Sequence, residues 1–286
     1  MNSWQARQIV PGESSGQTNW SKQIQQRYAD GAVKEWERLS ATPITRIEYL
    51  ITTYCLERYL PAVGWILDAG SGPGRYAIDV ARRGCRVAMF DLVGEMLQLG
   101  RDKIAGAGVS VHVTLTQGNL TALPYPDGVF DAVMSLGAPL SHIPNGSDRA
   151  AAIAELARVV KPGGVVLLTG LQRLASYRSA IYWISEDFFD QFMTAEQRTC
   201  GIFSGSQVWY TFSPGELQEL ACRAGLQVVD CIGCEGLANH LPLEHLEKVE
   251  ADPERWPIWK TLLLETCNEP SIIGISNHLL VVARKP

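Results

Sequence analysis

A glycine-rich segment behind a short apolar run constrains this chain more than any other feature of its sequence. Residues 65–69 (WILDA) are apolar enough to form a buried strand, and Gly70, Gly72 and Gly74 follow directly, ahead of a helical pattern. Glycine is required where the backbone turns tightly or approaches a ligand closely. The N-terminus of the next helix offers free N–H groups and a partial positive charge. The segment therefore predicts a strand–loop–helix unit that binds a ligand carrying an anionic group.

The sequence around this segment alternates between strand-like and helical patterns. Further strands are expected at 86–91, 110–117, 130–136, 165–170, 226–232 and 278–284, and helices at 45–59, 76–83, 149–160 and other stretches between the strands. Such alternation is typical of an α/β fold with a mostly parallel sheet covered by helices on both faces. We therefore predict a Rossmann-like, seven-stranded, mostly parallel sheet with helical cap insertions.

The same patterns divide the chain into four parts. We expect N-terminal cap helices at 1–59, a cofactor-binding Rossmann-like core at 60–172, and a lid or substrate insertion at 173–212. The C-terminal part of the core sheet follows at 213–286, with a helical insertion at about 235–268. Ser213 and Pro214 predict the start of a helix in which Ser213 is the N-cap.

Composition argues against several classes of protein. The net charge is −5 without a basic stripe, which is a poor basis for binding nucleic acid. No apolar run reaches the roughly 18 residues of a membrane span, and the first residues lack the apolar core of a secretory signal. We therefore expect a cytoplasmic protein that binds neither nucleic acid nor membrane.

Cysteine and histidine spacing predicts no metal site. The seven cysteines are scattered, and the C-x-x-C pair Cys231 and Cys234 has no second pair to complete a zinc site. His240 and His245 are five residues apart, which is not the spacing of one helix face. Structural thiols in a reducing compartment are the expected interpretation.

Two acidic residues accompany the glycine loop. Asp68 lies two positions before Gly70, and Asp91 ends the second strand, 23 residues after Asp68. A carboxylate at the second position can accept hydrogen bonds from both hydroxyls of a ribose. Asp68 is better placed to hold the loop through backbone N–H groups. The spacing G-x-G-x-G differs from the dinucleotide pattern G-x-G-x-x-G, which argues against a nicotinamide dehydrogenase.

These motifs together resemble the class I S-adenosylmethionine-dependent methyltransferases. LDAGSGPGR is similar to their first motif and FDLVGEML to their second, while QGNLTALPYPDGVFDAVMSLGAPLSHI and VVKPGGVVLLTG resemble the segments around their third to fifth strands. EPSIIGISNHLLVVARK resembles the antiparallel last strand of the small-molecule members. The resemblance covers residues 60–172 and, by topology, 213–284. It implies an antiparallel last strand, S-adenosyl-L-methionine as cofactor and S-adenosyl-L-homocysteine as product.

The resemblance also implies which residues hold the cofactor. These are Asp68, Gly70, Ser71, Gly72, Gly74, Asp91, Leu92, Met96, Asn119, Leu120 and Leu136, with Tyr28, Trp36 and Arg38 covering them from the N-terminal side. Members of the family often carry Asp where this chain has Asn119. The amide oxygen of Asn can still accept a hydrogen bond from the adenine amino group.

Methyl transfer from a sulfonium requires alignment and exclusion of water more than a particular catalytic side chain. If the acceptor must lose a proton, His142 is the best candidate general base, because it follows the fourth strand, where the resemblance places the methyl group. The alternative is a loop histidine that lines the pocket. Tyr177, Tyr182, Trp183 and Phe188 are candidates for an acceptor pocket, and the alternative for them is ordinary lid core.

The sequence thus predicts a methyltransferase acting on O, N or C of a small metabolite, as a monomer or homodimer. Two rivals stay open: a methyltransferase that acts on RNA or protein, and a non-catalytic module that binds S-adenosylmethionine.

Overall fold

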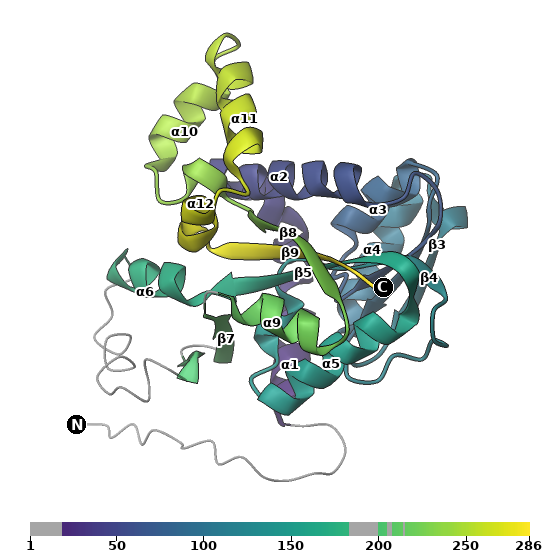
Figure 1. The fold of residues 1–286 in the computed structure, drawn as a ribbon. Coiled ribbons are helices and arrows are strands. Elements are labelled where there is room, and N and C mark those ends of the chain that lie inside the picture. Colours follow the sequence, from purple (N-terminus) through teal and green to yellow (C-terminus); the bar gives the residue numbers. More distant parts are fainter. Residues whose placement is uncertain (1–18, 183–199, 205–207, 214) are drawn as a thin grey trace, which may run out of the picture.

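The computed structural model describes residues 19–182, 200–204, 208–213 and 215–286 (Figure 1). Its strands are β1 (Trp65–Ala69), β2 (Arg86–Asp91), β3 (Val113–Gln117), β4 (Phe130–Ser135), β5 (Val160–Gln172), β6 (Ile202–Ser204), β7 (Val208–Phe212), β8 (Gln227–Gly233) and β9 (His278–Arg284). Its α-helices are α1 (Asn19–Ala41), α2 (Pro43–Tyr59), α3 (Arg75–Arg82), α4 (Gly94–Gly106), α5 (Gly146–Val159), α6 (Arg173–Tyr182), α9 (Glu216–Arg223), α10 (Leu243–Glu250), α11 (Arg255–Thr266) and α12 (Pro270–Ile275). Short 3₁₀ turns are η1 (Ser110–His112), η2 (Pro139–His142) and η4 (Gly236–Ala238).

The described strands build one main sheet in the order β3-β2-β1-β4-β5-β9-β8. Neighbours from β3 to β5 are parallel, whereas β9 runs antiparallel between β5 and β8. This confirms the predicted mostly parallel sheet with an antiparallel last strand. The strand order reverses at β1, which has β2 on one side and β4 on the other. Open α/β sheets bind ligands in the crevice beyond the carboxyl ends of the strands at such a point.

Helices cover both faces of this sheet because successive strand residues point to opposite sides. In β9, Leu280 and Val282 join a core with α2, α3 and α4, whereas Leu279 and Val281 join a second core with α5 and α9. Figure 1 shows α2 and α3 on one side of the sheet and α5 and α9 on the other. Both cores are apolar, so burial of the sheet's two faces holds the layers together.

Helix α1 contacts both cores and also forms a third apolar cluster: Leu39 belongs to the core with α2, α3 and α4, and Trp20 packs against the core with α5 and α9. Buried Ala32 of α1 meets Val93 and Met96, and these three residues form their own small apolar cluster between α1 and the start of α4. Thr42 caps the following helix, because its hydroxyl accepts from the Thr45 N–H while the Thr45 hydroxyl accepts from the Thr42 N–H. Helix α1 is therefore joined to the rest of the fold by a short capped turn, by this small cluster, and by Trp20 near its start and Leu39 near its end.

The structure differs from the predicted elements in a few places. Residues 110–112 form a 3₁₀ turn, and the third strand begins only at Val113. The prediction that Ser213 caps a helix is wrong, because α9 begins at Glu216 behind Gly215. The Ser213 N–H and hydroxyl instead donate to the Glu216 carboxylate. Within the predicted insertion, β6 and β7 form a hairpin, and β7 extends the sheet beside the far end of β5.

The second predicted insertion is helical. It contains η4, α10 and α11, which project beyond the edge of the sheet in Figure 1. Within the described ranges, we find no helix that is both long and apolar enough to span a membrane.

Candidate functional site

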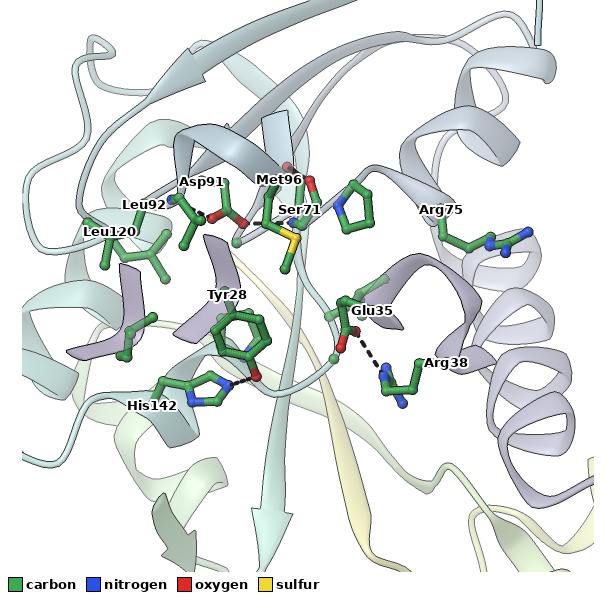
Figure 2. A pocket seen from close by; sticks show the side chains of 18 of the residues that line it. Tyr28, Glu35, Arg38, Ser71, Arg75, Asp91, Leu92, Met96, Leu120 and His142 are labelled. Carbon is green, nitrogen blue, oxygen red and sulfur yellow. Dashed lines mark hydrogen bonds and ion pairs between the residues drawn. The ribbon is translucent and has the colours of Figure 1, made fainter. Parts of the chain in front are cut away.

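A cavity of about 940 Å³, part of it open to solvent, lies beyond the carboxyl ends of β1, β2 and β4 (Figure 2). Its lining comes from α1 (Trp20, Ile24, Tyr28, Glu35, Arg38, Leu39), from the loop after β1 and the start of α3 (Gly70, Ser71, Gly72, Pro73, Arg75, Tyr76), from the segment after β2 (Asp91, Leu92, Val93, Met96), from that after β3 (Asn119, Leu120) and from that after β4 (Leu136, Gly137, Pro139, His142, Ile143). Segments far apart in the sequence thus meet at the point where the strand order reverses.

The glycine loop forms the floor of this cavity. Gly70 has a φ of 78°, and a Cβ there would lie 2.5 Å from Pro139 Cγ, so only glycine lets this loop touch η2. Gly72 has a φ of 51°, and a Cβ there would meet no atom within 4 Å, because this position faces the open cavity. Gly74 caps α3 and packs against Met89 outside the cavity lining.

Two backbone hydrogen bonds hold the Asp91 carboxylate in place beside the glycine loop. Its Oδ2 accepts from the Gly72 N–H at 2.7 Å, and its Oδ1 accepts from the Val93 N–H at 2.8 Å. Burial raises the pKa of Asp91 to about 6, although these backbone hydrogen bonds pull it down. A carboxylate oxygen accepts about two hydrogen bonds, so each oxygen keeps one acceptor position. Two hydroxyl groups side by side fit this arrangement.

Asp68 lies behind the loop and does not line the cavity. Its side chain is buried, and Oδ2 has no hydrogen-bond partner within the described part of the chain. Burial, together with the smaller effect of the nearby charge of Asp91, raises the pKa of Asp68 to about 8. An orphaned buried carboxyl next to a second acid is a place where a cationic ligand group is favourable.

The far side of the cavity is an apolar slot. Leu92, Met96 and Leu120 line it, with Asn119 at its edge. The Asn119 Oδ1 accepts from the Thr121 N–H at 3.1 Å and so caps the turn after β3. Because an amide oxygen has two lone pairs, Asn119 can also accept from a flat ring held in the slot.

Helix α1 supplies charged groups from the opposite wall. Arg38 donates to Glu35 Oε1 and to Glu48 Oε2, both at 2.8 Å. Burial would lower the pKa of Arg38, but the carboxylates of Glu48 and Glu35 raise it above its ordinary value. Trp36, which we also expected at the cofactor, lies outside the lining, with its ring centroid 3.9 Å from Arg75 Cζ.

Behind Arg38, three further ionisable side chains converge. Glu48, Glu235 and His278 each offer a ligand atom within 4.8 Å of the others, a spacing that could hold a metal ion. Their oxygens are already bonded, since Glu48 accepts from Arg38 and Glu235 pairs with His278 Nδ1 at 2.5 Å. Burial would lower the pKa of His278, but the charges of Glu48 and Glu235 raise it to about 9. We interpret this group as a buried charge network that fixes Arg38.

His142 meets Tyr28 where α1 crosses η2. The His142 Nε2 and the Tyr28 hydroxyl are 2.9 Å apart, and Figure 2 shows both side chains at the cavity wall. Burial, with a smaller effect of Arg27, lowers the pKa of His142 to about 3. Burial, helped by the charge of Glu35, raises the pKa of Tyr28 above its usual range. Both groups are therefore neutral at physiological pH.

None of the residues predicted to contact the acceptor is found in the cavity lining as the structure describes it. Tyr177 is half-buried on α6 and does not line the cavity. Tyr182 is the last residue of α6, and its side chain, like Trp183 and Phe188, lies outside the described residues.

Sequence reasoning missed several lining residues, among them Trp20, Ile24, Glu35 and Arg75. Glu35 could have been predicted from the sequence, because a residue three positions before Arg38 lies on the same face of the helix as Arg38.

Comparison with known proteins adds to this geometry. Residues 66–164 match the family model described as "Methyltransferase domain". The ubiquinone/menaquinone biosynthesis C-methyltransferase UbiE of Marinomonas sp. is 35% identical over 107 residues, which are 36% of this chain and 41% of that protein. Its counterpart from Geobacter sulfurreducens is 35% identical over 105 residues, covering 35% of this chain and 39% of that protein. The match thus spans about two fifths of these curated relatives.

Solved structures extend the likeness in fold over most of the chain. A S-adenosylmethionine-dependent methyltransferase from Methanosarcina mazei superposes with a TM-score of 0.58 at 18% identity, covering 81% of this chain and 96% of that one. Geranyl diphosphate methyltransferase, solved with geranyl diphosphate and sinefungin, gives a TM-score of 0.54 at 17% identity, over 85% of this chain and 79% of that one. Residues 66–164 thus match a methyltransferase domain, and the solved structures show that most of the chain shares the fold of these methyltransferases.

Proposed function

We propose that this chain, as a class I S-adenosylmethionine-dependent methyltransferase, transfers a methyl group to O, N or C of a small-molecule metabolite. The observation that carries the proposal is Asp91, whose two oxygens each keep one acceptor position beside the open face of Gly72. A ribose presents two adjacent hydroxyls, which is the ligand group that this carboxylate suits.

The residues around the cavity fit the rest of the cofactor. Leu92, Met96 and Leu120 would enclose the adenine, with Asn119 accepting from its amino group. Gly70 and Ser71, at the loop before α3, would hold the methionyl part together with Arg38, while the buried carboxyl of Asp68 lies behind this loop and favours a cationic group in front of it. When bound, S-adenosylmethionine supplies a methyl group on a sulfonium, whose sulfur leaves as a neutral thioether.

The other lining residues orient the acceptor and exclude water. Trp20, Ile24 and Tyr28 form a wall of α1 over the cavity, and Leu136 closes it beside β4. Since the pKa of His142 is about 3, it is a weak base in this environment. We propose that His142 acts as a neutral acceptor that orients the Tyr28 hydroxyl toward the acceptor molecule.

We further propose that the acceptor is small and that nucleic acid is not a partner. The cavity lies behind a complete helix, and the chain has a net charge of −5, so an extended anionic polymer has little to bind. Tyr177, with Tyr182, Trp183 and Phe188, stays our proposal for the more distant acceptor contacts. A monomer or homodimer is compatible with this function.

Substitution of Gly72 tests the proposal. The Gly72→Asp variant should fold, because the new side chain enters open space and Asp tolerates a positive φ better than most residues. Its carboxylate would occupy the cofactor's place and repel Asp91, so binding of S-adenosylhomocysteine should vanish in a calorimetric titration. The wild-type protein should also label a component of a metabolite extract from methyl-labelled S-adenosylmethionine. Unchanged affinity in the variant would contradict the assigned cofactor site.

A further inference from the structure

An arginine without a carboxylate partner lies beside the cavity wall. Arg27 is exposed on α1, next to the lining residue Tyr28. Within the described ranges, Arg27 has no ion pair, and its contacts are with aromatic rings. A lone exposed arginine is ordinary, so its surroundings decide whether it has a function.

Aromatic side chains hold the Arg27 guanidinium in place. Its Cζ lies 5.8 Å from the Tyr28 ring centroid and 5.6 Å from that of Trp209 on β7. His142 lies between the two rings, with its centroid 5.2 Å from Tyr28 and 4.5 Å from Trp209. A guanidinium that stacks on rings keeps its N–H groups free at its edge, where they can bind a planar anion at two points.

The two arginines that line the cavity, Arg38 and Arg75, already make hydrogen bonds within the protein. Arg38 is bonded to Glu35 and Glu48. Arg75 donates to the Trp36 carbonyl at 2.8 Å and stacks on its ring. Arg75 has no carboxylate partner, but it has this hydrogen bond, so of these three arginines Arg27 is the one for which the described part of the chain shows no hydrogen bond to a protein group.

The two carboxylates that line the cavity, those of Glu35 and Asp91, form no ion pair with Arg27. Glu35 is bonded to Arg38, and Asp91 accepts backbone N–H groups from the glycine loop and from Val93. His142, whose pKa is lowered to about 3 by burial and by Arg27, is neutral. The group of Arg27, Tyr28, His142 and Trp209, in which Tyr28 and His142 line the cavity and Arg27 and Trp209 lie beside it, therefore carries the positive charge of Arg27 among aromatic rings.

We propose that the methyl acceptor is a planar molecule that carries a negative charge, either a carboxylate or an ionised hydroxyl, and that Arg27 pairs with this charge. Trp209 and Tyr28 would then contact the flat frame of the acceptor. This inference rests on the proposed function and names the substrate class of the same site. It adds Arg27 and Trp209 to the residues that determine acceptor specificity.

Binding of simple planar probes tests the charge preference. The probes are 4-hydroxybenzoate and its neutral isostere 4-hydroxybenzamide, and 4-nitrophenolate, at a pH where it is ionised, with neutral 4-nitroanisole. Dissociation constants are measured by ligand-detected NMR titration of the wild type, Arg27→Gln and the control Arg101→Gln. Arg101 is exposed on α4 and outside the cavity lining, so its substitution removes the same charge elsewhere.

We expect at least one anion to bind the wild type about tenfold more tightly than its neutral isostere, as a single charge-assisted contact would give. Arg27→Gln should remove this preference, and Arg101→Gln should keep it. Preference for the benzoate alone identifies a carboxylate, and preference for the phenolate alone identifies an ionised hydroxyl. Equal affinity of anion and isostere in the wild type, or an unchanged preference in Arg27→Gln, overturns the proposal.

The same titrations are made with and without S-adenosylhomocysteine. If the cofactor product fails to bind while the anion preference persists, the proposed methyl transfer is wrong and the anion site stands. If the product binds and no anion is preferred, the substrate class is wrong and the proposed function stands. The two failures are thereby distinguished.

Discussion

Replacement of Asp91 by Asn should weaken cofactor binding by about two orders of magnitude. The change keeps the shape of the side chain but removes its charge and turns one acceptor atom into a donor. In the structure, Gly72 and Val93 each donate an N–H to a different oxygen of Asp91. The new amide nitrogen must therefore face one of these N–H groups, so one backbone hydrogen bond is lost whichever way the amide turns.

The expected magnitude follows from counting the remaining acceptor positions. Each carboxylate oxygen keeps one, which we assign to one ribose hydroxyl, and a hydrogen bond to a charged group contributes about 1.5–3 kcal/mol. Asn offers one neutral acceptor in their place. The loss is about 2–4 kcal/mol, which corresponds to a dissociation constant raised about 30- to 1000-fold.

Calorimetric titration with S-adenosylhomocysteine measures this loss. The matched control is Asp131→Asn, since Asp131 also accepts from a backbone N–H, that of Trp65, and lies outside the cavity lining. A circular dichroism melt of each variant checks that the fold is intact. If Asp91→Asn binds within about threefold of the wild type, the ribose assignment and the counting above are refuted.

Binding to the wild type should also depend on pH in a defined direction. Burial raises the pKa of Asp91 to about 6, and the ribose hydroxyls donate to its ionised form. Affinity should therefore fall as the pH decreases through about 6, and Asp91→Asn should lack this acid limb. Burial raises the pKa of Asp68 to about 8, and, despite its burial, the charges of Glu48 and Glu235 raise that of His278 to about 9, so a change in affinity above neutrality is separate from the titration of Asp91.

Three further outcomes are expected. Gly70→Ala should destabilise the fold and weaken cofactor binding more than Gly84→Ala, because both positions have positive φ but only the Cβ at Gly70 would meet Pro139. In denaturant unfolding, the free energy of unfolding should fall by about 1–3 kcal/mol more in Gly70→Ala than in Gly84→Ala. Equal losses in the two variants would contradict the contact with Pro139. The pKa of His278 in the folded state is raised to about 9. Its charge network should therefore stabilise the fold fully below about pH 6.5, and up to about 3 kcal/mol of this stability should be lost as the pH rises through 9. Thermal melts of His278→Gln should lack this pH-dependent loss, and an equal loss in the variant would disprove the assignment. His142→Ala should reduce turnover about tenfold and leave cofactor affinity within about threefold, whereas unchanged turnover would remove His142 from the reacting end.

Much of the fold was predictable because its signals are local. The second strand was expected at 86–91 and β2 spans Arg86–Asp91, since apolar run, turn and acid all lie in one short stretch. The hairpin of β6 and β7 was not predicted. Its β7 is fixed by pairing with Leu171 and Gln172 at the end of β5, a contact across some 40 residues that no local pattern encodes.

The same distinction explains the candidate site. Gly70, Gly72 and Asp91 could be identified because a strand–loop–helix unit places them by itself. The contribution of α1 depends on which face of that helix meets α4. The cluster of Ala32 with Val93 and Met96 sets this face, so Glu35 reaches the cavity while its neighbour Trp36 turns to Arg75.

Helix α1 has one more consequence, for the release of product. It forms a whole wall of the cavity, and its middle packs through the small cluster of Ala32 with Val93 and Met96, whereas Leu39 near its end belongs to one of the cores that hold the sheet. Detaching the middle of this helix would uncover the ligand while Leu39 keeps its end on the main core. The residence time of the spent cofactor is thereby set by how firmly α1 docks, so substitutions on its far side from the ligand can change the rate of each catalytic cycle without touching a reacting atom.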